Sequence, residues 1–158
     1  MESKKGEGQE LLELVSFNVG NEEFGVDISF VQEIIRMMQI TKVPNAPEFV
    51  EGVINLRGRV IAVINLRHKL GLSKIDYDKN TRIIVVEVKG NIVGFIVDAV
   101  SEVLRIPANI TEAPPELVSG IDSDFIKSVG KLEDRLLILI DLEKILSLTE
   151  TAELEAVA

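Results

Sequence analysis

Cysteine and tryptophan are absent from this chain of 158 residues, which has one histidine and one tyrosine. Without cysteine it can form no disulfide, no thiolate metal site and no cysteine nucleophile. The single histidine, His68, lies between Arg67 and Lys69 with no sequence-near partner at ligand or triad spacing. We therefore expect His68 to be a surface residue rather than a metal ligand or a catalytic base, and we expect no metal site.

Positive charge is scarce as well, because 17 Lys and Arg residues stand against 26 Asp and Glu residues, for a formal net charge of -9. Nucleic acids and anionic membranes are bound chiefly through clustered Lys and Arg, so we expect neither as a partner. Apolar runs are much shorter than a membrane span, and the first ten residues lack a signal-peptide core. These absences predict a cytoplasmic protein with no direct membrane insertion. Glycine-rich phosphate loops are absent too, so we expect no cofactor.

The sequence does contain an internal repeat. Residues 49–66 align without a gap with residues 125–142. An earlier segment repeats more loosely, since Val19-Gly20-Asn21 and the residues after it resemble Lys89-Gly90-Asn91 and the residues after it. Both matches keep their order along the chain at an offset of roughly 70 to 76 positions, as expected of a repeat architecture. The repeat predicts two related lobes.

Local patterns favour short strands within each copy. Val15, Phe17 and Val19 alternate with polar residues before a Gly20-Asn21 turn. Turn residues between apolar runs predict further hairpins at 89–91, 57–58 and 133–134. Short strands at this spacing are typical of small barrels. The segment 135–140 is apolar at both parities from Leu136 onward, which predicts a strand covered on both faces.

The expected helices are brief. Asp27 and Asp98 each precede an apolar stretch and are predicted to start a short helix, with Ser29 and Gln32 spaced as a capping box. A helix is also expected from Leu66 to Leu70, ended by Gly71, with a repeat mate from Leu142 to Leu148.

Asp27 and Asp98 are also the strongest catalytic candidates. The repeat places them at equivalent positions, so a pseudo-twofold axis could bring the two carboxylates together to share a proton. Neither is followed by the small residue and glycine that such a site needs for its tight turn, and helix capping explains both more simply. A hydrolase built on this pair stays as the alternative to a binding protein, and a pH-rate profile on generic peptides separates the two.

Asn55-Leu56-Arg57-Gly58 is the most informative short stretch. One interpretation is a β-turn in which Gly58 supplies backbone freedom and Arg57 points into water. The matched turn, Glu133-Asp134, has the opposite charge and no glycine, so the shared fold does not itself require Arg57. A guanidinium on a rigid hairpin tip suits recognition of a partner's carboxylates or carbonyls.

From about Leu12 to Leu148 the chain resembles the CheW family of bacterial chemotaxis coupling proteins. The resemblance is carried by the stretches 22–28, 31–34, 52–58, 94–98 and 134–139. It implies an all-β fold in which two SH3-like five-stranded β-barrel subdomains pack around a shared hydrophobic core, with a few short helices. A flexible arm (residues 1–11) is expected before this domain, 12–148, and an acidic tail (149–158) after it.

The resemblance also implies a function. Proteins of this family are non-enzymatic adaptors that couple membrane chemoreceptors, the methyl-accepting chemotaxis proteins, to the histidine kinase CheA. They bind the cytoplasmic receptor tip and the kinase's regulatory domain, and they can self-associate within arrays at the membrane. Within the family, the chain could also be the regulatory domain of a kinase or part of a coupling-receiver fusion, but its length favours a free adaptor.

Family positions carry over residue by residue. Positions that resemble the receptor-facing groove between the lobes, together with the arginine of the turn, are Val31, Glu33, Arg57, Ser101 and Val103. Positions linked with kinase binding are Gly52, Arg82 and Ile83. Arg82 departs from the apolar residue of some relatives. The family's motif turn corresponds to Asn55, Leu56, Arg57 and Gly58.

Overall fold

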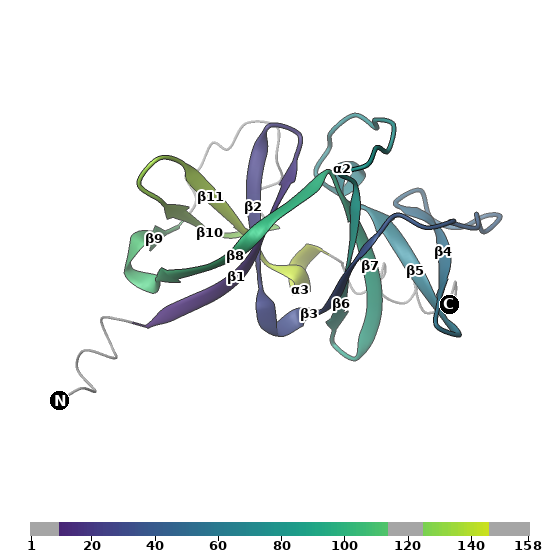
Figure 1. Cartoon of the computed structure of the whole chain (residues 1–158), viewed down its shortest axis with the longest axis horizontal. Coiled ribbons are helices and arrows are strands. Elements are labelled where there is room, and N and C mark those ends of the chain that lie inside the picture. The colour runs from purple at the N-terminus through teal and green to yellow at the C-terminus, as the bar shows by residue number, and fades with distance from the viewer. Residues whose placement is uncertain (1–9, 114–124, 146–158) are drawn as a thin grey trace.

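The computed structural model describes residues 10–113 and 125–145 of the chain. Two β-sheets lie side by side in it, with short helical turns between some of the strands (Figure 1). The strands are β1 (Leu11–Val19), β2 (Glu22–Asp27), β3 (Val31–Arg36), β4 (Val50–Leu56), β5 (Arg59–Asn65), β6 (Arg82–Val88), β7 (Asn91–Val97), β8 (Ala99–Pro107), β9 (Thr111–Glu112), β10 (Ile126–Lys131) and β11 (Leu136–Ile140). The helical turns are η1 (Ile28–Phe30), α2 (Leu66–Lys69), η2 (Ala108–Ile110) and α3 (Leu142–Ile145).

Each sheet takes strands from both copies of the repeat. Sheet A has the order β8-β1-β2-β11-β10-β9, and sheet B has the order β3-β6-β7-β5-β4. If each strand of sheet A except the two-residue β9 is replaced by its counterpart in the other copy of the repeat, the order of sheet A becomes the order of sheet B. In both sheets, two antiparallel hairpins meet through a parallel pair, β2 with β11 and β5 with β7. The two lobes predicted from the repeat are therefore present, but neither is folded from one copy alone.

The hairpins form where turn residues interrupt the apolar runs. Arg57 and Gly58 have φ values of 53° and 87°, and Lys89 and Gly90 have 52° and 83°. Two consecutive left-handed residues make the turn whose twist matches that of paired strands, and glycine adopts this conformation at the lowest cost. Asn55 supports the first turn, because its Oδ1 accepts a hydrogen bond of 2.8 Å from the Gly58 N–H.

The strand pairing corrects the repeat alignment in its looser part, by one residue at the turn and by two at the aspartates. β1 and β2 end their pairing at Val19 and Glu22, and β6 and β7 at Val88 and Asn91. The equivalent turns are therefore 20–21 and 89–90, so Asp27 and Asp98 do not occupy equivalent positions. The identity of the Gly-Asn pair favoured the wrong register, because a turn fixes strand register by its backbone and not by its residue names.

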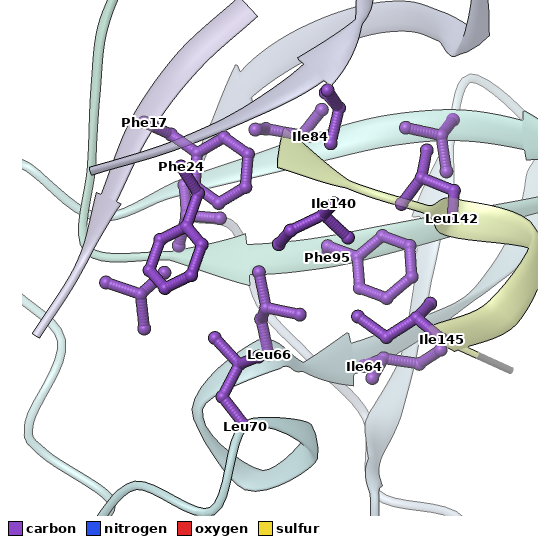
Figure 2. Packing of buried hydrophobic residues seen from close by; sticks show 14 of the residues in the cluster. Phe17, Phe24, Ile64, Leu66, Leu70, Ile84, Phe95, Ile140, Leu142 and Ile145 are labelled. Carbon is purple, nitrogen blue, oxygen red and sulfur yellow. The ribbon is translucent and has the colours of Figure 1, made fainter. Parts of the chain in front are cut away.

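A hydrophobic core shared by the two sheets holds them together. Figure 2 shows Phe17 and Phe24 of sheet A beside Ile84 and Phe95 of sheet B, with Leu142 of α3 among the residues packed around them. The Phe17 and Phe24 rings stack with centroids 5.9 Å apart. Burying each such side chain contributes about 1.5 to 3 kcal/mol to folding. The shared core implied by the family resemblance is thus confirmed.

Each sheet also has a second, private core on its other face. In β6, Ile84 points into the shared core while Ile83 and Val85 point into a cluster confined to sheet B. In β11, Ile138 and Leu139 divide in the same way between the shared core and the cluster of sheet A. Successive strand residues point to opposite faces, so a strand buried on both faces is apolar at both parities. The prediction for β11 is confirmed from residue 137 on and wrong for Leu136, which is 61% exposed.

The helix predictions have mixed outcomes. Asp27 starts η1, and its Oδ1 accepts a hydrogen bond of 2.9 Å from the Ser29 N–H, so the cap is Asp27 and not a box begun by Ser29. No helix follows Asp98, because the chain continues directly into β8. α2 ends before Gly71 as predicted, with Gly71 at a φ of 76°. α3 is its mate, although residues 146–148 lie outside the described ranges.

The ends of the described chain bear on the predicted bounds of the domain, residues 12–148. β1 begins at Leu11, one residue inside the predicted arm. The remaining arm, up to residue 9, and the predicted tail lie outside the described residues.

The two edges of sheet B are brought together beyond the end of β3. The chain that leaves β3 turns back so that Thr41 pairs with Val53 of β4.

Candidate partner-binding surface

The two aspartates of the hydrolase hypothesis lie far apart. Asp27 is paired with Leu14 on β1, whereas the Asp98 N–H donates to the carbonyl of Asn18. Four residues of strand separate these points, about 13 Å at the usual rise per residue. The carboxylates therefore cannot share a proton, and the predicted catalytic pair is wrong.

Asp98 instead links the two sheets through hydrogen bonds to α2 and to the β1–β2 turn. Its carboxylate accepts hydrogen bonds from Arg67 of α2, at 3.1 Å from Nε and 2.8 Å from Nη2, and one of 2.8 Å from the Gly20 N–H in the β1–β2 turn. Arg67 also donates from Nη1 to the carbonyl of Ser73. The hydrogen bond with Asp98 is the main reason that the pKa of Arg67 is raised. The helical capping role predicted for Asp98 is replaced by this contact.

Arg57 lies at the tip of the β4–β5 hairpin and forms an ion pair with Glu33 of β3. The Arg57 side chain is 69% exposed and that of Glu33 31% exposed. An exposed pair of this kind stabilises a fold by about 0.2 to 1 kcal/mol. Both residues were predicted as receptor-facing, but their contact, across 24 positions of sequence, was not.

A pocket of about 420 Å³ opens beside this ion pair. Its floor is made by the private core of sheet B, and its rim carries the charged residues of β3 and the hairpin. It is lined by Gln32, Glu33, Leu56, Arg57, Arg59, Ile61, Val85 and Ile92. The β4–β5 and β6–β7 turns both lie at this end of the sheet, because β5 and β7 run parallel from it (Figure 1).

The other receptor-facing predictions lie on β8, an edge strand of sheet A as β3 is an edge strand of sheet B. Val103 is 57% exposed there, and the Ser101 Oγ donates to the Asn18 Oδ1 at 2.8 Å. Val31, at the start of β3, is half-buried against the shared core. Among the described residues, no hydrogen bond or ion pair joins Ser101 or Val103 to the Glu33–Arg57 pair. The five residues therefore occupy two sheet edges and one hairpin tip.

The three residues linked with kinase binding are less accessible. Ile83 is fully buried in the private core of sheet B. Gly52 is buried where the Thr41 segment crosses β4, and a Cβ there would meet the Thr41 carbonyl oxygen and lie 2.6 Å from Ile40 Cγ2. Arg82 is half-buried and donates from Nη1 to the carbonyls of residues 79 and 81, at 2.8 and 2.9 Å. Gly52 and Arg82 each contact a neighbouring loop segment, whereas Ile83 is part of the core.

Sequence reasoning missed a polar network on sheet A. Arg135 donates to Glu23 at 2.5 Å and to Glu102 at 3.3 Å, and the Ser16 hydroxyl donates to Glu23. The hydrogen bond to Glu23 is also the main reason that the pKa of Arg135 is raised. Glu23 is 112 positions from Arg135 along the chain, so no spacing rule connects them.

A second anchored carboxylate lies under the 70–81 loop. Burial alone raises the pKa of Glu51, but hydrogen bonds from Lys74, Tyr77 and Asn65 and the charge of Lys74 outweigh burial and leave this pKa below its ordinary value. The Lys74 Nζ is 3.0 Å from the Glu51 carboxylate. Burial and the nearby Glu51 charge raise the pKa of Tyr77. The loop is thus fixed to β4 by charge.

No cluster of three or more His, Cys, Asp or Glu residues suited to a metal ion is found in the described part of the chain. His68 is exposed, as predicted. The described residues also include no helix long and apolar enough to cross a membrane.

Comparison with known proteins adds to this geometry. Residues 13–150 match the family model described as CheW-like domain. The chain is 42% identical over 151 residues to the chemotaxis protein CheW of Klebsiella aerogenes, covering 96% of this chain and 89% of that protein. It is 42% identical over 136 residues to the chemotaxis protein CheW of Thermotoga maritima, covering 85% and 87%. The crystal structure of the scaffolding protein TtCheW from Thermoanaerobacter tengcongensis matches with a TM-score of 0.81 at 40% identity, covering 88% of this chain and 94% of that one.

Proposed function

The chain belongs to the CheW-like domain family, and from this membership we propose that it couples membrane chemoreceptors to the histidine kinase CheA without catalysing a reaction itself. Its relatives are named as chemotaxis proteins and a structural neighbour as a scaffolding protein, so its role is that of a chemotaxis adaptor. The observation that carries the proposal is the family match across residues 13–150.

The receptor tip is proposed to bind along the two sheet edges and the hairpin tip. Val31, Glu33 and Arg57 supply this surface on sheet B, and Ser101 and Val103 supply it on sheet A. An edge strand with an exposed apolar side chain, Val103, and a hairpin tip with an exposed guanidinium, Arg57, suit a partner that brings apolar and acidic side chains of its own.

The kinase's regulatory domain is proposed to bind at the other end of sheet B. Gly52, Arg82 and Ile83 are too buried to form most of such a contact. Gly52 and Arg82 would act by holding the 37–41 and 79–81 segments in position, because Gly52 adjoins Thr41 and Arg82 bonds the carbonyls of 79 and 81. Ile83 would act through the private core of sheet B, against which Met37 and Ile40 pack. The protein is proposed to work in the cytoplasm, recruited to membrane-associated receptor arrays in which copies can also associate with one another.

A binding experiment tests the proposal directly. The purified chain is mixed with a receptor cytoplasmic fragment and with CheA, separately and together, and complexes are measured by calorimetry and pull-down. We expect binding to each partner, a complex of all three, and receptor-dependent activation of the kinase without any added cofactor. Absence of heat and of capture with both partners would overturn the coupling function.

A further inference from the structure

The pairing registers make positions in the two sheets equivalent. Ser16 lies opposite Gly25 as Val85 lies opposite Gly94, and the parallel pairs β2–β11 and β5–β7 have matching registers. The edge strands match as well, because Glu102 pairs with Ser16 as Glu33 pairs with Val85. Each residue of the polar network in sheet A therefore has an equivalent position in sheet B. Ser16 corresponds to Val85, Glu23 to Ile92, Glu102 to Glu33, and Arg135 to Arg59.

At these equivalent positions the two lobes differ in what fills the space. In sheet A the Glu23 side chain is only 11% exposed and is held by Arg135 and the Ser16 hydroxyl. In sheet B the counterparts of Glu23 and Ser16 are Ile92 and Val85, which carry no polar group, and this is where the 420 Å³ pocket opens. The open pocket is thus the place where sheet B lacks the carboxylate that closes sheet A.

The charges left at the pocket rim are unbalanced. Arg59, the counterpart of Arg135, is exposed and forms no ion pair among the described residues. Glu33 pairs with Arg57 instead, so among the lining residues two guanidinium groups face one carboxylate, in a chain whose net charge is -9. Glu87 of β6 lies outside the lining and accepts a hydrogen bond of 3.4 Å from the Gln32 Nε2. The floor is apolar, with Ile61 and Val85 only 3% and 2% exposed. A rim of this kind favours an added carboxylate, and a floor of this kind favours an apolar side chain.

We infer that this pocket is an anchor site for a protein partner, which inserts one apolar side chain onto Ile61, Val85 and Ile92 and places an adjacent Asp or Glu against Arg59. The partner supplies the carboxylate that Glu23 supplies internally in sheet A. The inference rests on the proposed coupling function, because the rim residues Glu33 and Arg57 belong to the proposed receptor-facing surface. It adds a definite pocket, a definite residue (Arg59) and a definite side-chain pair in the partner.

The pocket is tested first without any partner. Methyl NMR follows the Ile, Leu and Val signals while the blocked dipeptide N-acetyl-Leu-Glu-amide is added, with N-acetyl-Ala-Glu-amide and N-acetyl-Leu-Lys-amide as controls. We expect saturable shifts at Ile61, Val85 and Ile92 with the first dipeptide and much smaller shifts with the other two. Leu137, the sheet A counterpart of Ile61, serves as an internal reference and should not move. Equal shifts for all three dipeptides, or none, would overturn the inference.

Two substitutions separate the pocket from the general surface. Ile92→Glu adds to sheet B the carboxylate that its counterpart, Glu23, provides in sheet A, so it should pair with Arg59, close the pocket and abolish the dipeptide shifts. Arg59→Ala removes an exposed side chain without touching the core, and should remove the preference for Glu over Lys in the dipeptide. Leu11→Glu adds a charge at an exposed apolar position outside the pocket and should change neither result.

The same variants are then tested with the receptor fragment and CheA. Ile92→Glu and Arg59→Ala should each weaken binding of the receptor fragment at least fivefold, because the pocket rim belongs to the proposed receptor-facing surface, while Leu11→Glu and thermal melts report any general damage. If the wild-type chain binds both partners and neither pocket variant weakens the receptor complex, the anchor site is refuted and the coupling function stands. If the wild-type chain binds neither partner, the coupling function fails, whereas the dipeptide titration still decides whether the pocket has the inferred chemistry.

Discussion

Two arginines with nearly equal exposure allow the role of Arg57 to be tested against a matched control. Arg57 is 69% exposed and pairs with Glu33, and Arg105 is 70% exposed and pairs with Glu13. We expect Arg57→Ala and Arg105→Ala each to lower the free energy of unfolding by no more than about 1 kcal/mol, because exposed ion pairs contribute little.

Function should distinguish the two substitutions. Arg57→Ala should strongly reduce receptor-dependent kinase activation, whereas Arg105→Ala, two positions from Val103 on β8, should reduce it much less, as measured in a reconstituted kinase assay beside thermal melts. Early melting of the Arg57 variant, or equal activity of the two, would show that Arg57 is not primarily an interface residue.

Glu51 gives a pH dependence whose sign follows from its environment. Its folded-state pKa lies below the ordinary value of 4.5, so its contribution to stability is present above that pH and is lost as the pH falls through the folded-state pKa. Glu51→Gln should therefore destabilise the fold at neutral pH, by about 1 to 2 kcal/mol for a charged group held by several hydrogen bonds. The difference from wild type should shrink at acid pH.

Urea denaturation of both proteins at pH about 7 and about 3 measures this linkage. Glu48→Gln, at an exposed position, is the control for removing a carboxylate. A stability gap for Glu51→Gln that stays constant across this range would show that the Lys74 and Tyr77 contacts do not hold the Glu51 carboxylate in the charged form.

At the scale of elements, β4 depends on a glycine at its bulge. A Cβ on Gly52 would meet the Thr41 backbone and Ile40, whereas a Cβ on Gly58 would meet nothing within 4 Å. Gly52→Ala should therefore lower the unfolding free energy by more than about 2 kcal/mol, while Gly58→Ala should cost about 1 kcal/mol from its backbone conformation alone. Chemical denaturation measures both, and equal losses would indicate that the Thr41 segment moves aside.

Local signals predicted the hairpins well and the ends of strands poorly. Alternation and turn residues identified β1, β2 and the hairpins predicted at 57–58 and 89–91, the second of which turns at 89–90, because these signals act within a few residues. The helix expected after Asp98 is absent because β8 pairs with β1, and pairing between distant segments overrides a capping signal. The exposure of Leu136 likewise depends on which segments pack over the start of β11, and the sequence of β11 alone does not determine that packing.

The candidate site was predictable only as single residues. Arg57 stood out because its repeat mate has the opposite charge, but its pairing with Glu33 required the position of β3 beside the hairpin. The pocket rests on the difference between Glu23 and Ile92, and these became equivalent only when the strand registers corrected the alignment by one residue. An internal repeat in a sequence therefore indicates which positions in the two copies are equivalent, but it does not indicate which residues are in contact.

At the scale of the whole molecule, the repeat copies are interleaved rather than side by side. β3 of the first copy pairs with β6 of the second, and β8 of the second pairs with β1 of the first. An alignment of the two copies is the same whether each folds alone or exchanges hairpins, so only the structure shows the exchange. The consequence is that neither copy of the repeat contains all the strands of a sheet, and the strands of sheet B lie within residues 31–97, which cross from the first copy into the second.

The interleaving predicts that the copies cannot fold apart. A chain ending at Lys79 would keep β3, β4 and β5 but lose β6 and β7, which connect β3 to β5 in sheet B. Its unpaired edges and half of the shared core would face water, so residues 1–79 and 80–158 expressed separately should each lack a cooperative thermal transition and tend to aggregate. Refolding the two fragments together should restore a cooperative transition and the native circular dichroism spectrum, since the cut falls in the exposed 73–80 loop. A single fragment that melted cooperatively would mean that the strands of one copy can form a stable sheet by themselves. The exchange of hairpins between the copies would then not be needed for the sheets to form.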